Sequence, residues 1–354
     1  MTNWLQTTDA DLAWFEDVYR RYRLLHTDPA NCTPMIIINA PVEQIPTWEQ
    51  RLADPLVMLR AELDQIRPHV ELHDDKVPSV RVQFGTAQVA AAFGCELTVP
   101  PNSLPAAATH VLQQAEDVGN LAMPSLDAGW YGKLAEWTRL WQELLPPGVE
   151  IQHPDIQSAF NTAHLIRGND ILTDFYDCPQ LVDELLDKVT DFMIALTRHL
   201  KVMISADREW FLDWGSMWRG GARISNCSMH MISPEFYREH VLARDRRFFA
   251  EVGGGRMHYC GSYSEVIGEF FKVPMIYGLD FDISHHDFFE LCEAAPERVV
   301  LCAGDGIESK LVSRLLAGDW PRKRNIIVHV GVKSMAEGRA VLGKLRAMVD
   351  CADE

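Results

Sequence analysis

A histidine and a cysteine two positions apart are the residues of this sequence best suited to chemistry. They lie in the run Met257-His258-Tyr259-Cys260-Gly261, whose composition favours a β-strand. Alternate side chains of a strand point to the same face, so His258 and Cys260 project from one side. An imidazole nitrogen and a thiolate sulfur can supply two corners of a tetrahedral zinc site. A buried histidine beside an inert thiol would give the same pattern, so a third ligand has to decide between the two.

Cys302 and His329 are the candidates for this third ligand. Each lies in a later strand-like segment that a closed sheet would bring towards the strand of His258. Zinc with three protein ligands keeps a fourth position for a substrate thiol and lowers the pKa of that thiol. Because the thiolate is the nucleophile in alkyl transfer, such a site predicts methyl or other alkyl chemistry.

Three aspartates indicate a second chemistry. Asp280 and Asp282 share one face of a predicted strand, and Asp305 lies in a Gly-Asp-Gly turn. Clustered carboxylates in a cleft can have raised pKa values and act as proton donors. Equally, Asp282 could cap the next segment through Ser284, and Asp305 could serve only its turn. Both interpretations stay open.

Further polar or aromatic residues lie at the ends of other predicted strands. Polar strand ends are common because they meet solvent, and Trp214 could simply pack, but the accumulation predicts a binding pocket. The candidates are Gln83, Asp155, Asp213 and Trp214 for substrate binding, and Asn226 for catalysis.

The elements that must position these residues alternate between strand and helix from residue 78 onward. The predicted strands are Val80–Phe84, Glu150–Pro154, Glu209–Trp214, Ala222–Asn226, Arg256–Cys260, Ile276–Phe281, Val299–Ala303 and Ile326–Val330. Strands that alternate with helices favour a parallel sheet, and eight repeats favour closure into an α/β fold of the (β/α)₈ TIM-barrel type. Catalytic groups of such barrels stand at the carboxyl ends of the strands.

We predict two regions along the chain. Residues 1–75 form an N-terminal helical extension packed on the barrel, although Met35–Asn39 is a short β-like run. Residues 76–354 form the barrel, with a helical insertion at about 97–145 that could be a lid, a dimer contact or a partner surface.

Composition excludes several classes of protein. The chain has 354 residues and a formal net charge of −17, which argues against nucleic acid and against an anionic membrane surface. No apolar run is long enough to span a bilayer, and the N-terminus lacks the form of a signal peptide. The eight cysteines are scattered through a large chain, which predicts reduced thiols in a cytoplasmic protein.

The second half of the chain resembles the uroporphyrinogen decarboxylase superfamily. The motifs that carry the resemblance are Ile232-Ser233-Pro234-Glu235-Phe236-Tyr237, His258-Tyr259-Cys260-Gly261, Gly278-Leu279-Asp280 and Leu301-Cys302-Ala303-Gly304-Asp305. Upstream, Phe84-Gly85-Thr86, Ala92-Phe93-Gly94-Cys95 and Leu165-Ile166-Arg167-Gly168-Asn169-Asp170 also fit a branch of it. The resemblance covers roughly residues 75 to 349 and implies a TIM-type barrel.

Two activities of that superfamily compete. The porphyrinogen decarboxylases bind an anionic tetrapyrrole through an N-terminal Arg-Gln-Ala-Gly-Arg segment, which this sequence lacks. The corrinoid-dependent methyltransferases of the methylcobalamin:coenzyme M type bind zinc through a His-x-Cys pair and a distant cysteine. His258 and Cys260 match the pair, but His329 stands in the neighbourhood where that distant cysteine is expected. The resemblance therefore implies the methyltransferase branch with an altered third ligand.

The leading hypothesis is a zinc-dependent methyltransferase that moves a methyl group between a corrinoid and a small thiol or related acceptor. One alternative is a cofactor-independent decarboxylase or lyase that acts on a small carboxylic acid or tetrapyrrole. A second is a non-catalytic corrinoid- or tetrapyrrole-binding protein. The expected partners are a small-molecule substrate and, for the leading hypothesis, a corrinoid protein; whether the chain forms a homodimer stays open.

Overall fold

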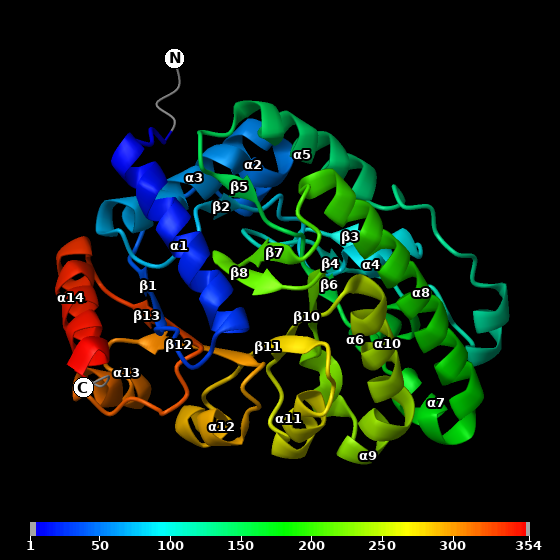
Figure 1. Ribbon diagram of the computed structural model, residues 1–354. Helices are drawn as coiled ribbons and strands as arrows, with labels where there is room; N and C mark the ends of the chain where they lie inside the picture. The colour runs from blue at the N-terminus through cyan, green and yellow to red at the C-terminus, as the bar shows by residue number, and fades with distance from the viewer. Residues whose placement is uncertain (1–4, 352–354) are drawn as a thin grey trace.

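The computed structural model describes residues 5–351 and shows an α/β fold built on a parallel sheet of seven strands. The strands in spatial order are β1 (Met35–Asn39), β13 (Ile326–Gly331), β12 (Val300–Gly306), β11 (Ile276–Phe281), β10 (Gly255–Tyr259), β9 (Ala222–Ser225) and β6 (Ile156–Gln157). All neighbours in this order pair in parallel. Helices surround the strands on the outside (Figure 1), which is the arrangement of a TIM-type barrel.

The sheet is extended by a short parallel pair. β2 (Ser79–Val80) pairs with β5 (Glu150–Ile151). Residues 152–155 then connect β5 to β6. The free edge of β1 is hydrogen-bonded by side chains instead of a strand. Its Ile36 and Ile38 N–H groups donate to the carboxylates of Asp75 (2.6 Å) and Asp74 (2.8 Å). Buried backbone N–H groups need partners, so these two aspartates fix the chain before β2 against β1.

Helices follow most of the strands. They are α1 (Asp9–Thr27), α2 (Trp48–Ala53), α3 (Pro55–Leu72), α4 (Gln88–Ala92), α5 (Tyr131–Leu144), α6 (Ala159–Arg167), α7 (Ile171–Asp177), α8 (Pro179–Ile204), α9 (Pro234–Phe236), α10 (Leu242–Val252), α11 (Ser264–Phe271), α12 (Phe288–Ala294), α13 (Lys310–Leu316) and α14 (Met335–Cys351). Local sequence explains their ends. Thr8 and Asp11 form a capping box at the start of α1, and Gly253 ends α10 with a φ of 82°.

Side chains of the barrel strands alternate between two apolar clusters. On β1, Ile36 and Ile38 pack in the large cluster between the sheet and the helices, whereas Met35 and Ile37 belong to a smaller cluster inside the barrel. The inner cluster also contains Trp218, which is fully buried. This period of two is what places every second residue of a strand towards the barrel interior.

One predicted barrel strand is wrong. Residues 209–214 were expected in the barrel, but β7 (Trp210–Asp213) pairs antiparallel with β8 (Ser216–Arg219) in a separate hairpin. The hairpin and α1 lie across one end of the barrel (Figure 1). Gly278 of β11 makes room for it, because a Cβ atom there would come within 2.3 Å of the Trp218 ring. Met35–Asn39, assigned to the N-terminal extension, provides a barrel strand instead.

The stretch from 97 to 145 is less helical than expected. It contains a two-stranded hairpin of β3 (Leu97–Thr98) and β4 (Ala106–Ala107), the 3₁₀ helix η1 (Ala115–Asn120) and α5.

Among residues 5–351, no helix has both the length and the apolar character needed to cross a membrane. The seven cysteines with described side chains are free thiols.

The buried His26 predicts how stability depends on pH. It packs edge-on against Trp210 and Trp218, with ring centroids 5.5 and 6.1 Å away. Burial lowers its pKa to about 3, from 6.5 in the unfolded chain. Between these values the unfolded state binds a proton that the native state does not, so this histidine's contribution to stability falls as pH drops below about 6.5.

We therefore expect His26→Phe to flatten the loss of stability in mild acid. Between pH 7 and pH 5, the fall in the free energy of unfolding should be smaller in the variant by about 2 kcal/mol. Urea unfolding at the two pH values measures this difference. An unchanged pH dependence in the variant would show that His26 is not held neutral.

Candidate functional site

A cavity of about 800 Å³ opens at the carboxyl ends of the barrel strands. The tip of the β7–β8 hairpin, at Trp214 and Gly215, forms part of its wall. Inward-facing residues from around the barrel line the rest, among them Asn39, Arg81, Asp155, Arg256, Asp280 and His329. A polar cavity at this end of the barrel is where enzymes of this fold carry their active sites.

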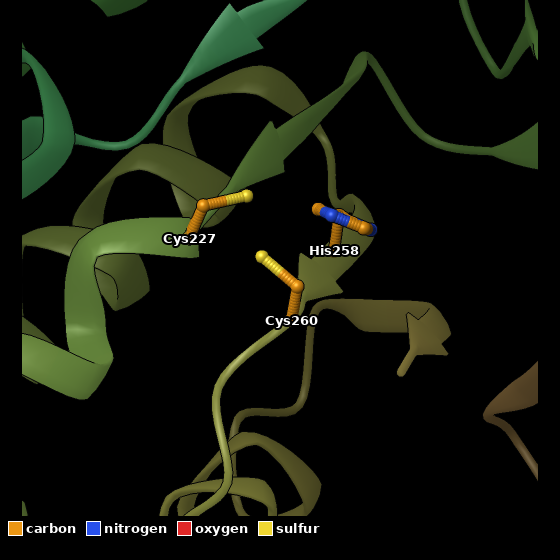
Figure 2. A group of neighbouring side chains, drawn as sticks. All are labelled: Cys227, His258 and Cys260. Atoms are coloured by element: carbon orange, nitrogen blue, oxygen red, sulfur yellow. The ribbon is translucent and has the colours of Figure 1, made fainter. Parts of the chain in front are cut away.

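Two thiols and an imidazole gather beside this cavity. His258 lies in β10, Cys260 follows the end of that strand, and Cys227 begins the 3₁₀ helix η2 (Cys227–Met231) directly after β9. One ligand atom from each of the three lies within 4.8 Å of the others. Figure 2 shows the two sulfur atoms and the imidazole ring pointing into one space. All three side chains are half-buried, so the group remains open to a ligand.

Strand pairing explains why the three meet. β9 and β10 are neighbours in register, with Ser225 opposite His258, and the Asn226 N–H donates to the His258 carbonyl at 2.9 Å. The chain leaving β9 therefore begins η2 beside the end of β10. His258 and Cys260 share a face because they are two positions apart along the strand direction.

Asp280 holds the His258 ring from the neighbouring strand β11. Its Oδ2 lies 2.5 Å from His258 Nδ1, and its Oδ1 lies 3.1 Å from Arg256 Nε. Burial disfavours the charged form of Asp280, but Arg256 and His258 outweigh it and hold the pKa of this carboxyl well below its usual range. Burial likewise opposes the charged form of His258, yet Asp280 raises the pKa of the imidazole to about 9. With Nδ1 facing this carboxylate, Nε2 is the nitrogen left for another partner.

Each of the two thiols shifts the pKa of the other. Hydrogen bonding to Cys227, and then to His258, lowers the pKa of the Cys260 thiol to about 4. Hydrogen bonding to Cys260 and burial raise the pKa of Cys227. The pair therefore carries one thiolate at neutral pH, and a divalent cation would favour ionisation of the second.

A buried ionic network lies under the cavity and the thiol group. It joins three arginines from β9, β10 and the segment after β2 to three aspartates. The contacts are Arg81 with Asp213, Arg256 with Asp213 (2.7 Å) and Asp280 (3.1 Å), and Arg223 with Asp155 (2.6 Å) and Asp213 (3.9 Å). Its charges balance, so the network fixes the orientation of its members without adding net charge.

Two further cations that form no ion pair with a described residue line the cavity. Arg51 stacks over the Trp48 ring, 3.5 Å from its centroid. Lys76 Nζ lies 3.1 Å from His69 Nε2, and His69 Nδ1 lies 2.7 Å from Asp74 Oδ2. Burial lowers the pKa of both cations. Attraction by the Glu62 carboxylate, which lines the same cavity, opposes this effect on both cations, and an anionic ligand there would oppose it further.

Several predicted site residues do line the cavity. These are Gln83, Asp155, Trp214, Asp280, Asp305, Cys302 and His329. Cys302 and His329 were predicted as metal ligands but are not in the three-residue group. Burial raises the pKa of the Cys302 thiol to about 12 and lowers the pKa of His329 to about 3. Their strands, β12 and β13, are two and three places away from β10, whereas β9 is adjacent to it.

The remaining predicted residues have other contacts. Asp213 belongs to the ionic network. Asn226 is buried, and its amide donates to the Asp245 carboxylate at 2.8 Å. Asp282 accepts from the N–H (2.8 Å) and the hydroxyl (2.7 Å) of Ser284, as the capping interpretation predicts. Cys227, which directly follows the predicted strand Ala222–Asn226, is the additional member of the thiol group.

A comparison with models of protein families shows which family the chain belongs to. Residues 42–301, well over half of the chain, match the family model described as Uroporphyrinogen decarboxylase (URO-D). The chain belongs to the URO-D family. A search of curated proteins found no match. The matched region covers the motifs up to Gly278-Leu279-Asp280, ends at the start of the Leu301–Asp305 motif, and begins upstream in the loop after β1.

Solved structures show the same fold as this URO-D family chain. Eighteen chains match it. One is a methyltransferase from Methanosarcina mazei, with a TM-score of 0.70 and 17% sequence identity over 95% of this chain and 99% of that chain. At this identity the likeness shows the barrel architecture from end to end.

Proposed function

We propose that this URO-D family protein is a zinc-dependent methyltransferase that moves a methyl group between a corrinoid and a small thiol or related acceptor. The observation that carries the proposal is the group of Cys227, His258 and Cys260, whose ligand atoms lie within 4.8 Å of one another. Two thiolates and an imidazole are a donor set that suits zinc, and three protein ligands leave one position open, as in catalytic zinc sites.

The surroundings of the three residues fit a metal ion. Asp280 contacts His258 Nδ1, and a carboxylate in this position usually orients a metal-binding histidine and strengthens its donor nitrogen. Cys260 is ionised at neutral pH before any metal binds. When bound, zinc would supply a lowered pKa for a substrate thiol and so a thiolate nucleophile at neutral pH.

The chain's own residues would position the acceptor. β1 stands four places from β10 in the strand order, and Arg51 and Lys76 line the same cavity as Asp280, which contacts His258. A molecule that reaches the thiol group through this cavity would have its other end near Arg51 and Lys76. We propose that these two cations bind an anionic group of the acceptor. The M. mazei structure, named as a methyltransferase, supports the choice of reaction class.

The decarboxylase alternative depends on one of three predicted acids. Asp280 is ionised and paired with Arg256 and His258, and hydrogen bonds from Ser284 lower the pKa of Asp282, so neither is a good proton donor. Asp305 lines the cavity, and its Oδ1 accepts from the Gly306 N–H at 2.7 Å. A decarboxylase would therefore need Asp305.

Mixing the protein with methylcobalamin and a small thiol tests the proposal. We expect formation of the methyl thioether together with loss of the methylcobalamin spectrum, and no reaction after zinc is removed with a chelator. Asp305→Asn should retain this activity within about threefold. If the wild type forms no thioether with any corrinoid, or if activity survives complete removal of metal, the methyltransferase proposal fails.

Lys76→Met should impair recognition of charged acceptors. A hydrogen bond to a charged group contributes about 1.5–3 kcal/mol, so KM for 3-mercaptopropionate should rise about 10- to 100-fold. KM for the uncharged 2-mercaptoethanol should change less than about twofold. Lys344→Met, which removes an exposed lysine from α14, is the matched control. Equal effects of Lys76→Met on the two thiols would contradict the assignment of Lys76.

A further inference from the structure

A second cavity, of about 360 Å³, lies between α1, the end of α8 and the β7–β8 hairpin. Its buried wall is apolar at Ile151, Phe211, Leu212 and Met217, and the exposed residues Glu16, Arg23, Glu150 and Asp207 line its rim. Two buried polar side chains, Lys201 and His153, also line it. We propose that this cavity binds a small hydroxycarboxylate with an apolar body.

Lys201 is the residue that we expect to bind the carboxylate of the ligand. Its side chain is only 7% exposed, and its ammonium donates to the Trp210 carbonyl and lies 5.8 Å from the centroid of the Phe211 ring. Asp207 and Glu150 attract it from the exposed rim of the cavity, but no residue in 5–351 lies within ion-pair distance of the ammonium. An ammonium has three N–H donors, and a buried charge is costly unless an opposite charge accompanies it. A carboxylate in the cavity would supply this counter-ion.

His153 is the residue that we expect to accept a hydrogen bond from the hydroxyl group of the ligand. It is 3% exposed, and its Nδ1 lies 3.0 Å from the Pro154 carbonyl oxygen. A carbonyl can only accept, so Nδ1 carries the proton of the neutral ring and Nε2 has a free lone pair. Nε2 is buried and has no hydrogen-bond partner among the described residues. A hydroxyl group on the ligand can donate to this nitrogen, which a carboxylate cannot do.

The second cavity is separate from the active-site cavity. β7 divides them: Trp210, Phe211 and Leu212 line the second cavity, whereas Trp214, beyond the end of the strand, lines the first. The volume and the apolar buried wall with two buried polar groups are typical of small-molecule sites. A compound such as mandelate combines a carboxylate, a neighbouring hydroxyl and an apolar ring in this size range.

Calorimetric titration with three matched compounds tests the proposal. At pH 7 we expect mandelate to bind with a Kd of about 1 mM or tighter. Mandelamide, which lacks the charge, and phenylacetate, which lacks the hydroxyl, should each bind at least about tenfold more weakly, a difference of about 1.4 kcal/mol. Equal binding of the three compounds, or no binding of mandelate, would overturn the proposal.

Variants locate the binding and assign each group. Lys201→Met should remove the advantage of mandelate over mandelamide, and His153→Phe its advantage over phenylacetate. Ile204→Trp, which fills the cavity from its partly exposed rim, should abolish binding without removing either polar group. Lys344→Met, which removes an exposed lysine from α14, should leave mandelate binding unchanged. Mandelate binding that survives both Lys201→Met and Ile204→Trp would place the ligand elsewhere and sink the proposal.

Discussion

Cys227→Ser and Cys260→Ser should each reduce bound zinc from about one equivalent per chain to below about 0.1. Each variant removes one of three ligands and leaves two, which are too few for a stable site in competition with buffer. Inductively coupled plasma mass spectrometry on protein purified without chelator measures the metal content. Methyl transfer should be lost with the metal.

Cys302→Ser and Cys292→Ser are the matched controls. Both thiols are buried, and neither belongs to the group of Cys227, His258 and Cys260. They should retain about one equivalent of zinc, and thermal unfolding shows whether each variant is folded. If Cys302→Ser loses zinc while Cys227→Ser keeps it, the third ligand is on β12 and the assignment of Cys227 is wrong.

Asp280→Asn should weaken zinc binding about 10- to 100-fold. Loss of a residue that hydrogen-bonds a metal-ligating histidine commonly has an effect of this size. The amide introduced by this substitution would keep an oxygen that can accept from His258 Nδ1 but would lose the negative charge that strengthens the imidazole. Competition with a chromophoric chelator measures the affinity. The three protein ligands remain, so residual binding is expected.

Asp282→Asn is the control for this prediction. Asp282 is two positions further along and is bound to Ser284, away from the imidazole. Its variant should bind zinc within about twofold of the wild type. Similar affinities of the wild type and Asp280→Asn would mean that the 2.5 Å contact with His258 contributes nothing to the metal site.

Most of the barrel could be predicted from the alternation of strands and helices, but two strands could not. Trp210–Asp213 has the apolar and aromatic composition of a barrel strand, and only its antiparallel pairing with Ser216–Arg219 shows that it is a hairpin. Met35–Asn39 was assigned to the N-terminal extension, because its place beside β13 depends on contacts nearly 300 residues apart in sequence. Local patterns carry no information on such pairings.

Some residues of the candidate site could likewise be predicted from the sequence, and others could not. His258 and Cys260 could be predicted because a strand places residues two positions apart on one face. Cys227 could not be chosen over Cys302 or His329, since the choice depends on which strand lies beside β10 and on the turn into η2. Lys76 and Lys201 gave no sequence signal, because their significance comes from burial at positions where no described carboxylate lies within ion-pair distance.

X-ray absorption at the zinc edge of the purified protein tests the central claim most directly. The account predicts two sulfur ligands at about 2.3 Å and one nitrogen ligand at about 2.0 Å, with one further light atom in the first shell. Cys227→Ser should leave a single sulfur in whatever zinc remains. Absence of zinc, or a shell made of oxygen and nitrogen without sulfur, would contradict the account.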